Sequence, residues 1–147
     1  MDRLPNVLSS KTLLLDYHLP SKLEEISKLA DAVDNALPDR PDLAFSANLC
    51  LDELISNIIL HGLKGADDRL IRVRMNISNE WLEIIIKDDA PPFDPFAKAP
   101  EPDLDLDIED RPIGGLGVYF VKKMMDVARA YYDGSGNLII LFKTLRK

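Results

Sequence analysis

The spacing of apolar and polar residues divides the chain into alternating strand-like and helix-like segments. Apolar residues that alternate with polar ones indicate a strand, whereas apolar residues three and four positions apart indicate a helix that buries one face. On this basis we expect strands over 12–20, 69–78, 81–88, 128–133 and 137–145, and helices over 20–38, 40–62 and 116–126.

The strongest helical pattern is the one over 40–62. Pro41 stands near its start, where backbone N–H groups have no intrahelical acceptor and the missing N–H of proline costs nothing. Gly62 is a plausible C-terminal stop. The helix over 20–38 opens with a capping box from Ser21 to Glu24. In the longer helix, the apolar stripe expected to face the core consists of Leu51, Leu54, Ile55 and Ile58.

Two short turns group the expected strands into hairpins. The dipeptide NE at 79–80 joins one pair of strands, and the tripeptide GSG at 134–136 joins the last pair. Hairpins make neighbouring strands antiparallel, and the order β-α-α-β-β-loop-α-β-β puts the helices on one face of the sheet. We therefore predict a single α+β domain over 1–147, a two-layer sandwich of a mostly antiparallel sheet and helices.

Charge and composition exclude several classes of protein. The formal net charge is −7, but six acids lie between residues 101 and 110, which contain no base, so the remainder is at −1. Neither part carries the positive charge that nucleic-acid binding requires. No apolar run approaches the roughly 18 residues of a membrane span, and residues 1–10 lack the apolar core of a signal peptide. We expect a cytoplasmic protein without a membrane partner.

The potential metal-binding and redox residues are few. Cys50 is the single cysteine, which excludes an internal disulfide, and its apolar helical surroundings favour a buried thiol over a catalytic one. His18 and His61 have no companions at ligand spacing, so we expect no zinc site.

Glu53 and Asn57 are four residues apart on the helix over 40–62, on the side opposite the apolar stripe. Two polar residues on an outer helix face are often merely solvated. A carboxylate and an amide oxygen one turn apart also suit a general base beside a Mg²⁺ ligand.

Asp88 and Asp89 end an apolar strand where the chain enters a proline-rich loop. Aspartate is common in such turns. A carboxylate held at a strand end can instead accept a hydrogen bond from the exocyclic amine of adenine, and guanine, which lacks that donor, would be rejected.

The glycines at 114, 115 and 117 lie at the start of the helix expected over 116–126. Such a loop can be a plain hinge, or it can present backbone N–H groups and a positive helix end to phosphate. The sequence here is neither a dinucleotide fingerprint nor a Walker loop. The acidic stretch before it is either a solvated loop or part of a lid, which would need Mg²⁺ or Arg111 to approach phosphate.

Taken in order, the segments ELISNIILHG, DDAPPFDP and RPIGGLGVYFVKKMMD resemble the three nucleotide-binding boxes of the GHKL ATPases, the superfamily of gyrase, histidine kinases and related chaperones. The resemblance covers nearly the whole chain and implies a Bergerat-type ATP-binding fold. Within the superfamily the small size is similar to that of the anti-sigma factor serine kinases. Such proteins bind a sigma factor, phosphorylate a serine of a small antagonist protein with ATP and Mg²⁺, and often form homodimers.

The resemblance implies a role for individual residues. Glu53 would be the base that activates the attacking hydroxyl, Asn57 the Mg²⁺ ligand, and Asp88 the acceptor for the adenine amine. Gly115 and Gly117 would line the triphosphate. The residues implied in nucleotide binding are Asn57, Asp88, Ala90, Pro92, Phe93, Arg111, Gly114, Gly115, Leu116 and Gly117.

The second box departs from the usual family pattern, because Ala90 stands at its first glycine and Pro92 at the second glycine position. If the backbone required a positive φ at Ala90, the strain would be about 1–2 kcal/mol. This departure and the acidic stretch motivate an alternative function, a module that binds a partner with or without nucleotide and catalyses nothing. A stand-alone ATP hydrolase is a third possibility.

Overall fold

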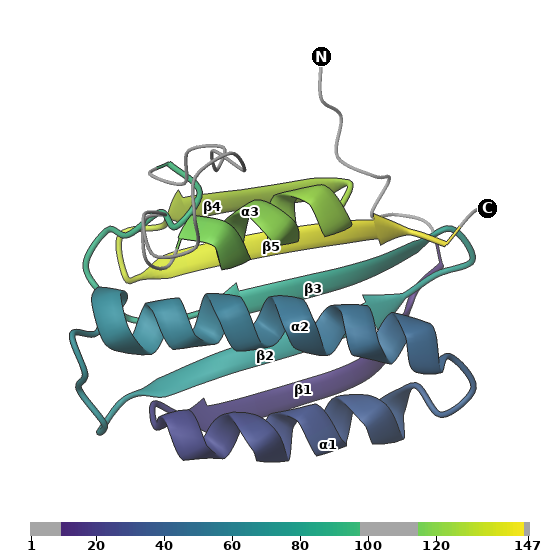
Figure 1. The fold of residues 1–147 in the computed structure, drawn as a ribbon, viewed down its shortest axis with the longest axis horizontal. Helices are drawn as coiled ribbons and strands as arrows, with labels where there is room; N and C mark the ends of the chain where they lie inside the picture. The colour runs from purple at the N-terminus through teal and green to yellow at the C-terminus, as the bar shows by residue number, and fades with distance from the viewer. Residues whose placement is uncertain (1–9, 98–114, 146–147) are drawn as a thin grey trace, which may run out of the picture.

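A computed structural model describes residues 10–97 and 115–145, which form one sheet and its covering helices (Figure 1). Its elements in chain order are β1 (Thr12–Pro20), the 3₁₀ turn η1 (Leu23–Glu25), α1 (Ile26–Ala36), α2 (Pro41–Asn57), the π-helical turn η2 (Ile58–Gly62), β2 (Leu70–Ile77), β3 (Trp81–Lys87), α3 (Gly115–Met124), β4 (Val127–Tyr132) and β5 (Asn137–Thr144).

The five strands form a single sheet in the order β1-β2-β3-β5-β4, and every neighbouring pair is antiparallel. The two hairpins predicted from the sequence are the pairs β2–β3 and β4–β5. The central contact joins β3 to β5, with Ile84 opposite Leu141. Strand β5 therefore lies between β3 and β4, which brings the turn before β5 next to the end of β3.

All three α-helices cover the same face of the sheet (Figure 1). Residues two apart on a strand point to the same side, and alternate residues such as Ile71, Val73 and Met75 on β2 are fully buried. The predicted two-layer α+β architecture is confirmed. The apolar core includes Leu29, Val33, Leu51, Leu54, Ile55, Ile58, Ile84, Ile86, Ile139 and Leu141.

Helix α2 and the first residue of η2 pack the predicted stripe into this core, where all four residues are at most 1% exposed. Pro41 begins the helix as expected. The end differs in detail, because the left-handed residues that reverse the chain are Lys64 (φ 53°) and Gly65 (φ 81°), not Gly62. Instead, Gly62 ends η2, where the Leu63 N–H donates to the Ile58 carbonyl at 2.7 Å.

The helical segment Pro41–Gly62 is long and apolar enough to meet the length and composition of a membrane span, although it contains no continuous apolar run. Half of its most apolar stretch is buried inside the fold. One apolar side packs against the core, whereas Phe45, Leu49 and Leu60 are exposed at 66%, 41% and 49%, so core packing accounts for only part of its composition.

The predicted capping box at Ser21 is wrong. Neither η1 nor α1 has a side-chain cap, and Ser21 is 1% exposed. Its hydroxyl donates to the Ala66 carbonyl at 2.7 Å and accepts from the Arg69 N–H at 3.1 Å. The residue thus ties the end of β1 to the segment that leads into β2, which leaves its hydroxyl unavailable to the helix.

Candidate functional site

Glu53 on α2 and Gly117 on α3 are in direct contact. The half-buried side chain of Glu53 lies against the first turn of α3, and a Cβ built on Gly117 would overlap its carboxylate. Gly117 does not have a positive φ, so close approach and not backbone conformation is the reason for glycine here. The first and third sequence boxes therefore meet at this point.

The other end of the same helical segment meets the second box. A Cβ on Gly62 would lie 3.4 Å from the Phe93 ring and 3.7 Å from the Ala90 Cβ. Glu53 and Gly62 are nine residues apart, which at 1.5 Å per helical residue is about 14 Å. Asn57 lies between them and is half-buried. One helical segment thus connects all three boxes.

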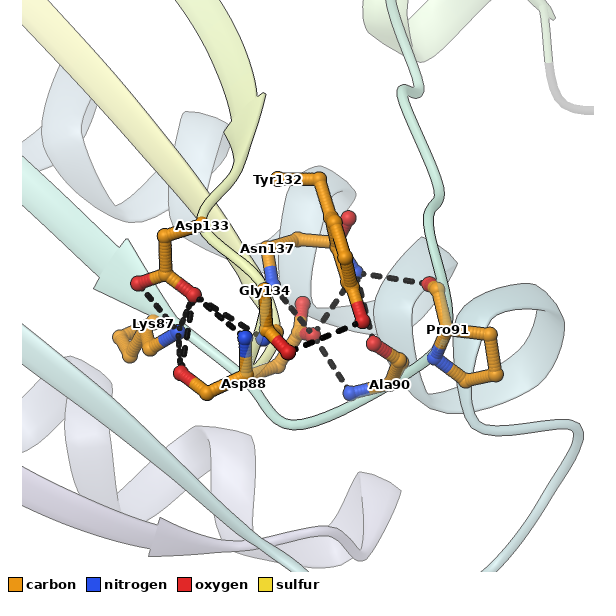
Figure 2. A network of polar contacts seen from close by, with 10 residues as sticks. Lys87, Asp88, Ala90, Pro91, Tyr132, Asp133, Gly134 and Asn137 are labelled. Atoms are coloured by element: carbon orange, nitrogen blue, oxygen red, sulfur yellow. Dashed lines mark hydrogen bonds and ion pairs between the residues drawn. The ribbon is translucent and has the colours of Figure 1, made fainter.

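The carboxylate of Asp88 is buried, with 3% of the residue exposed, and it is held through one oxygen (Figure 2). Its Oδ1 accepts hydrogen bonds from the Ala90 N–H at 2.8 Å, from the Asn137 side-chain amide at 2.9 Å and from the Asn137 N–H at 3.3 Å. Within residues 10–97 and 115–145, no hydrogen-bond donor is recorded on Oδ2. That oxygen is left to accept a bond from a ligand.

Asn137, the first residue of β5, is a site residue that the sequence analysis missed. It is 2% exposed, and its side chain bonds to three parts of the loop after β3 (Figure 2). Besides Asp88, its Nδ2 donates to the Pro91 carbonyl at 2.9 Å, and its Oδ1 accepts from the Phe93 N–H at 2.8 Å. Its only signal in the sequence was a polar residue at the start of an apolar strand.

The possible strain at Ala90 does not occur. Among the described residues other than glycine, only Lys64 has a positive φ. Ala90 is 2% exposed and donates its N–H to Asp88, so the loop takes its course without a glycine at this position. Pro92 is exposed and Phe93 is half-buried beside Gly62.

Asp89 differs from its neighbour Asp88 in burial and in partner. It is exposed and pairs with Arg69 at 2.8 Å, an ion pair that joins this end of β3 to the start of β2. Such an exposed pair contributes little to stability. Of the two acids that the sequence singled out, only Asp88 is buried within the loop network.

The turn between β4 and β5, which leads into Asn137, has its own charged network (Figure 2). The Asp133 carboxylate accepts from the Lys87 Nζ at 2.8 and 2.9 Å, from the Ser135 N–H at 2.9 Å and from the Gly136 N–H at 3.1 Å. The bonds from Lys87 and then Ser135 hold the pKa of Asp133 well below its usual range. This network fixes the turn just before Asn137.

The thiol of Cys50 is buried, as the sequence predicted. Its Sγ lies 3.7 Å from the Met124 Sδ, between α2 and α3. Burial raises the pKa of the Cys50 thiol to about 11, with Lys143 opposing the shift. At neutral pH it is a protonated core side chain.

The third box is described from Gly115 onward. Arg111, Gly114 and the acidic stretch over 101–110 lie outside the described residues. Gly115 and Leu116 belong to the first turn of α3, of which the backbone is described. In the described part of the chain, no three His, Cys, Asp or Glu side chains form a group that could hold a metal ion.

The family model of the histidine kinase-like ATPase domain matches residues 19–143 of this chain. That range includes every described strand and helix at least in part. The chain belongs to this family. The superfamily resemblance carried by the three boxes is therefore confirmed. The match begins near the end of β1 and ends within β5, so it contains the contacts of both Glu53 and Asp88.

Curated relatives of this histidine kinase-like ATPase are named "Serine-protein kinase RsbW". The protein of that name from Listeria monocytogenes is 29% identical over 133 residues, covering 86% of this chain and 84% of the relative. Its namesake from Bacillus licheniformis is 28% identical over 129 residues, which are 83% of this chain and 75% of the relative. The one from Staphylococcus aureus is 24% identical over 95% and 92% of the two chains.

Among solved structures, the histidine kinase domain of the blue-light activated histidine kinase EL346 from Erythrobacter litoralis has a similar fold. The TM-score is 0.51 at 15% sequence identity, over 86% of this chain and 61% of that chain. The chain thus spans about three-fifths of the solved protein that it matches. At this identity, the similarity concerns the fold alone.

Proposed function

We propose that the protein is an ATP-dependent serine kinase that phosphorylates a small antagonist protein and sequesters a sigma factor or a similar regulator. The observation that carries the proposal is the position of α2, whose segment from Glu53 to Gly62 contacts α3 at one end and the loop after β3 at the other. The relatives named serine-protein kinases support the reaction type. The sigma factor, the antagonist and a homodimer remain predictions from the family resemblance.

Asp88 is the residue we propose for recognition of adenine. A buried carboxylate whose Oδ1 is saturated by three donors offers its Oδ2 to the exocyclic amine of the base. Guanine has a carbonyl in place of that amine, so the buried acceptor would face another acceptor. We therefore expect the site to bind ATP and to reject GTP.

The residues around Asn57 and α3 fit the phosphate part of the nucleotide. The first turn of α3 has backbone N–H groups without an intrahelical partner, and helix N-termini attract anions. Asn57 is half-buried on α2, one helical turn after Glu53, whose carboxylate contacts Gly117 in this turn. Mg²⁺ usually keeps several waters and binds few protein ligands together with substrate phosphates, which suits a single amide oxygen. When bound, Mg²⁺ would neutralise charge that develops on the transferred phosphoryl group.

Glu53 is the proposed general base. Within residues 10–97 and 115–145 its carboxylate has no recorded hydrogen-bond or ion-pair partner, so it is free to accept a proton. In the proposed reaction it takes the proton of the substrate serine as the hydroxyl oxygen attacks the γ-phosphorus. The bond from that phosphorus to the β–γ bridging oxygen breaks, and ADP leaves. Phosphoryl transfer of this kind depends mainly on positioning and charge neutralisation.

The first experiment is titration calorimetry of ATP into the protein with and without Mg²⁺, with GTP as the competing base and Asp88→Asn as the variant. Mg²⁺-dependent ATP binding that is lost in Asp88→Asn and absent for GTP supports the proposal. An absence of ATP binding to the wild-type protein contradicts it and favours a module that only binds a partner.

The second experiment tests catalysis. Labelled ATP, Mg²⁺ and the cognate antagonist should give phosphoserine with the wild-type protein and at least 100-fold less with Glu53→Gln, in line with the usual contribution of a general base. Equal phosphorylation by the variant would remove Glu53 from the proposed role. Phosphate release without any protein substrate would indicate an ATP hydrolase.

A further inference from the structure

We propose that Asn137 is the positioning residue of the adenine site: it holds the loop over 88–93 in its binding conformation and aims the Asp88 carboxylate. This inference rests on the proposed ATP-binding function. Asn137 lies on β5, 49 residues after Asp88, and its own backbone carbonyl accepts the Asp88 N–H at 3.1 Å. The pairing of β3 with β5 thus fixes the position of the Asn137 amide relative to the loop.

The hydrogen-bonding groups of the Asn137 side chain are all used by the loop. An amide has two N–H donors and one carbonyl acceptor. One donor reaches Asp88 Oδ1 at 2.9 Å and the other the Pro91 carbonyl at 2.9 Å, with the Ala90 carbonyl further away at 3.4 Å. The acceptor receives the Phe93 N–H at 2.8 Å. Asn137 is 2% exposed, so water does not compete for these hydrogen bonds.

The loop itself has few means of holding its shape. Pro91 and Pro92 have no backbone N–H to donate. Ala90 donates its N–H to Asp88, so the next N–H available is that of Phe93, which goes to Asn137. Buried carbonyl and amide groups in such a loop require partners from elsewhere in the fold. Asn137 supplies these partners on both sides of the two prolines.

The same amide fixes the orientation of the Asp88 carboxylate. Three donors converge on Oδ1, and two of them belong to Asn137. Rotation of the carboxylate away from this orientation would break all three bonds, so the preferred arrangement keeps one oxygen on these donors and leaves the other for the base. Without the Nδ2 donor, the carboxylate would keep only its two backbone donors and could turn more easily. The expected consequence is weaker discrimination between adenine and guanine.

The test compares Asn137→Ala with a matched control, Asn76→Ala. Asn76 is another buried strand asparagine, 6% exposed, whose amide donates to Glu83 at 2.9 Å on β3. Calorimetric affinities for ATP and GTP are measured for both variants and the wild-type protein, at a temperature where all three are folded by circular dichroism. We expect Asn137→Ala to weaken ATP binding at least tenfold and to reduce the ATP-over-GTP preference, while Asn76→Ala changes neither.

A second measurement reads the loop without nucleotide. The Phe93 N–H bonds to the Asn137 side chain, so its hydrogen exchange should become at least tenfold faster in Asn137→Ala and stay unchanged in Asn76→Ala. Wild-type exchange of Phe93 in Asn137→Ala, or wild-type ATP affinity and preference in that variant, would overturn the inference. If the wild-type protein binds no ATP, the proposed function is wrong, and so is the role of Asn137 in orienting Asp88 toward adenine. In that case faster Phe93 exchange would support the loop-holding role alone.

Discussion

The carboxylate of Glu53 occupies the space that any side chain at Gly117 would need. The two residues come from α2 and α3, 64 positions apart in the sequence, and their contact brings the proposed base to the start of a helix. Because Gly117 has an ordinary helical φ, alanine there would strain no backbone but would force the Glu53 carboxylate to move.

This relationship predicts that the effect of Gly117→Ala depends on Glu53. In the wild-type background the added methyl group should lower the free energy of unfolding by about 1 kcal/mol, the low end of overpacking costs, because the flexible Glu53 side chain can move aside. In the Glu53→Ala background the same change should raise it by up to about 1 kcal/mol, because alanine is favoured over glycine within a helix. Urea unfolding of the four proteins measures both values, and the same sign in both backgrounds would contradict the contact.

The turn before β5 contains a matched pair of glycines. A Cβ on Gly136 would overlap the main-chain carbonyl of Asp88, whereas a Cβ on Gly134 would meet nothing within 4 Å. Gly134 has φ of 92°, so Gly134→Ala should cost roughly 1–2 kcal/mol of unfolding free energy through strain alone. Gly136→Ala should in addition displace the end of β3.

We therefore expect Gly136→Ala to weaken ATP binding at least tenfold and Gly134→Ala to leave it within twofold of wild type. Calorimetry at a temperature where both variants are folded provides the comparison. Wild-type affinity in Gly136→Ala would mean that the loop tolerates a shift of Asp88.

Ser21 should matter for stability through the tertiary structure and not through the helix that follows it. Removal of its buried hydroxyl in Ser21→Ala leaves the Ala66 carbonyl without its donor, and should lower the unfolding free energy by about 1–3 kcal/mol. Glu24→Gln should change it by less than about 0.5 kcal/mol, because Glu24 is exposed and caps no helix. Chemical denaturation measures both values. Equal losses of unfolding free energy in the two variants would support the capping box and contradict the tertiary role of Ser21.

Cys50 should be chemically inert in the folded protein. Burial raises the pKa of its thiol from 9.0 to about 11, so at pH 8 almost none of it is the reactive thiolate. Alkylation by iodoacetamide at pH 8 should be slow in buffer and become fast in urea. Rapid alkylation under native conditions would contradict the buried position between α2 and α3.

The same shift predicts a pH dependence of stability. The folded thiol binds its proton more tightly than the unfolded one, so the contribution of Cys50 is fully present below pH 9 and is lost as the pH rises from 9 to about 11. In Cys50→Ala the unfolding free energy should therefore fall less steeply over this range than in the wild-type protein. Identical slopes would mean that the thiol titrates normally when folded.

Much of the fold was predictable because its elements are local. The apolar stripe of the long helix follows from a helical period within eight residues, and each hairpin joins strands separated by three or four residues. Such patterns require no knowledge of the rest of the chain. The family membership also followed from three motifs in order, which the match over 19–143 confirmed. The roles assigned to Glu53, Asn57 and Asp88 remain predictions.

The sequence alone determined the secondary structure, the antiparallel hairpins and the family. Only the tertiary structure decided what Ser21, Gly117 and Asn137 contact, because the partners described above are 44 or more residues away and reach them through strand order and helix packing. A serine before a helix predicts a helix cap from local sequence alone, but here the Ser21 hydroxyl bonds to the Ala66 carbonyl instead. The pairing of β3 with β5 placed an asparagine beside Asp88, and no local period of the sequence encodes that proximity.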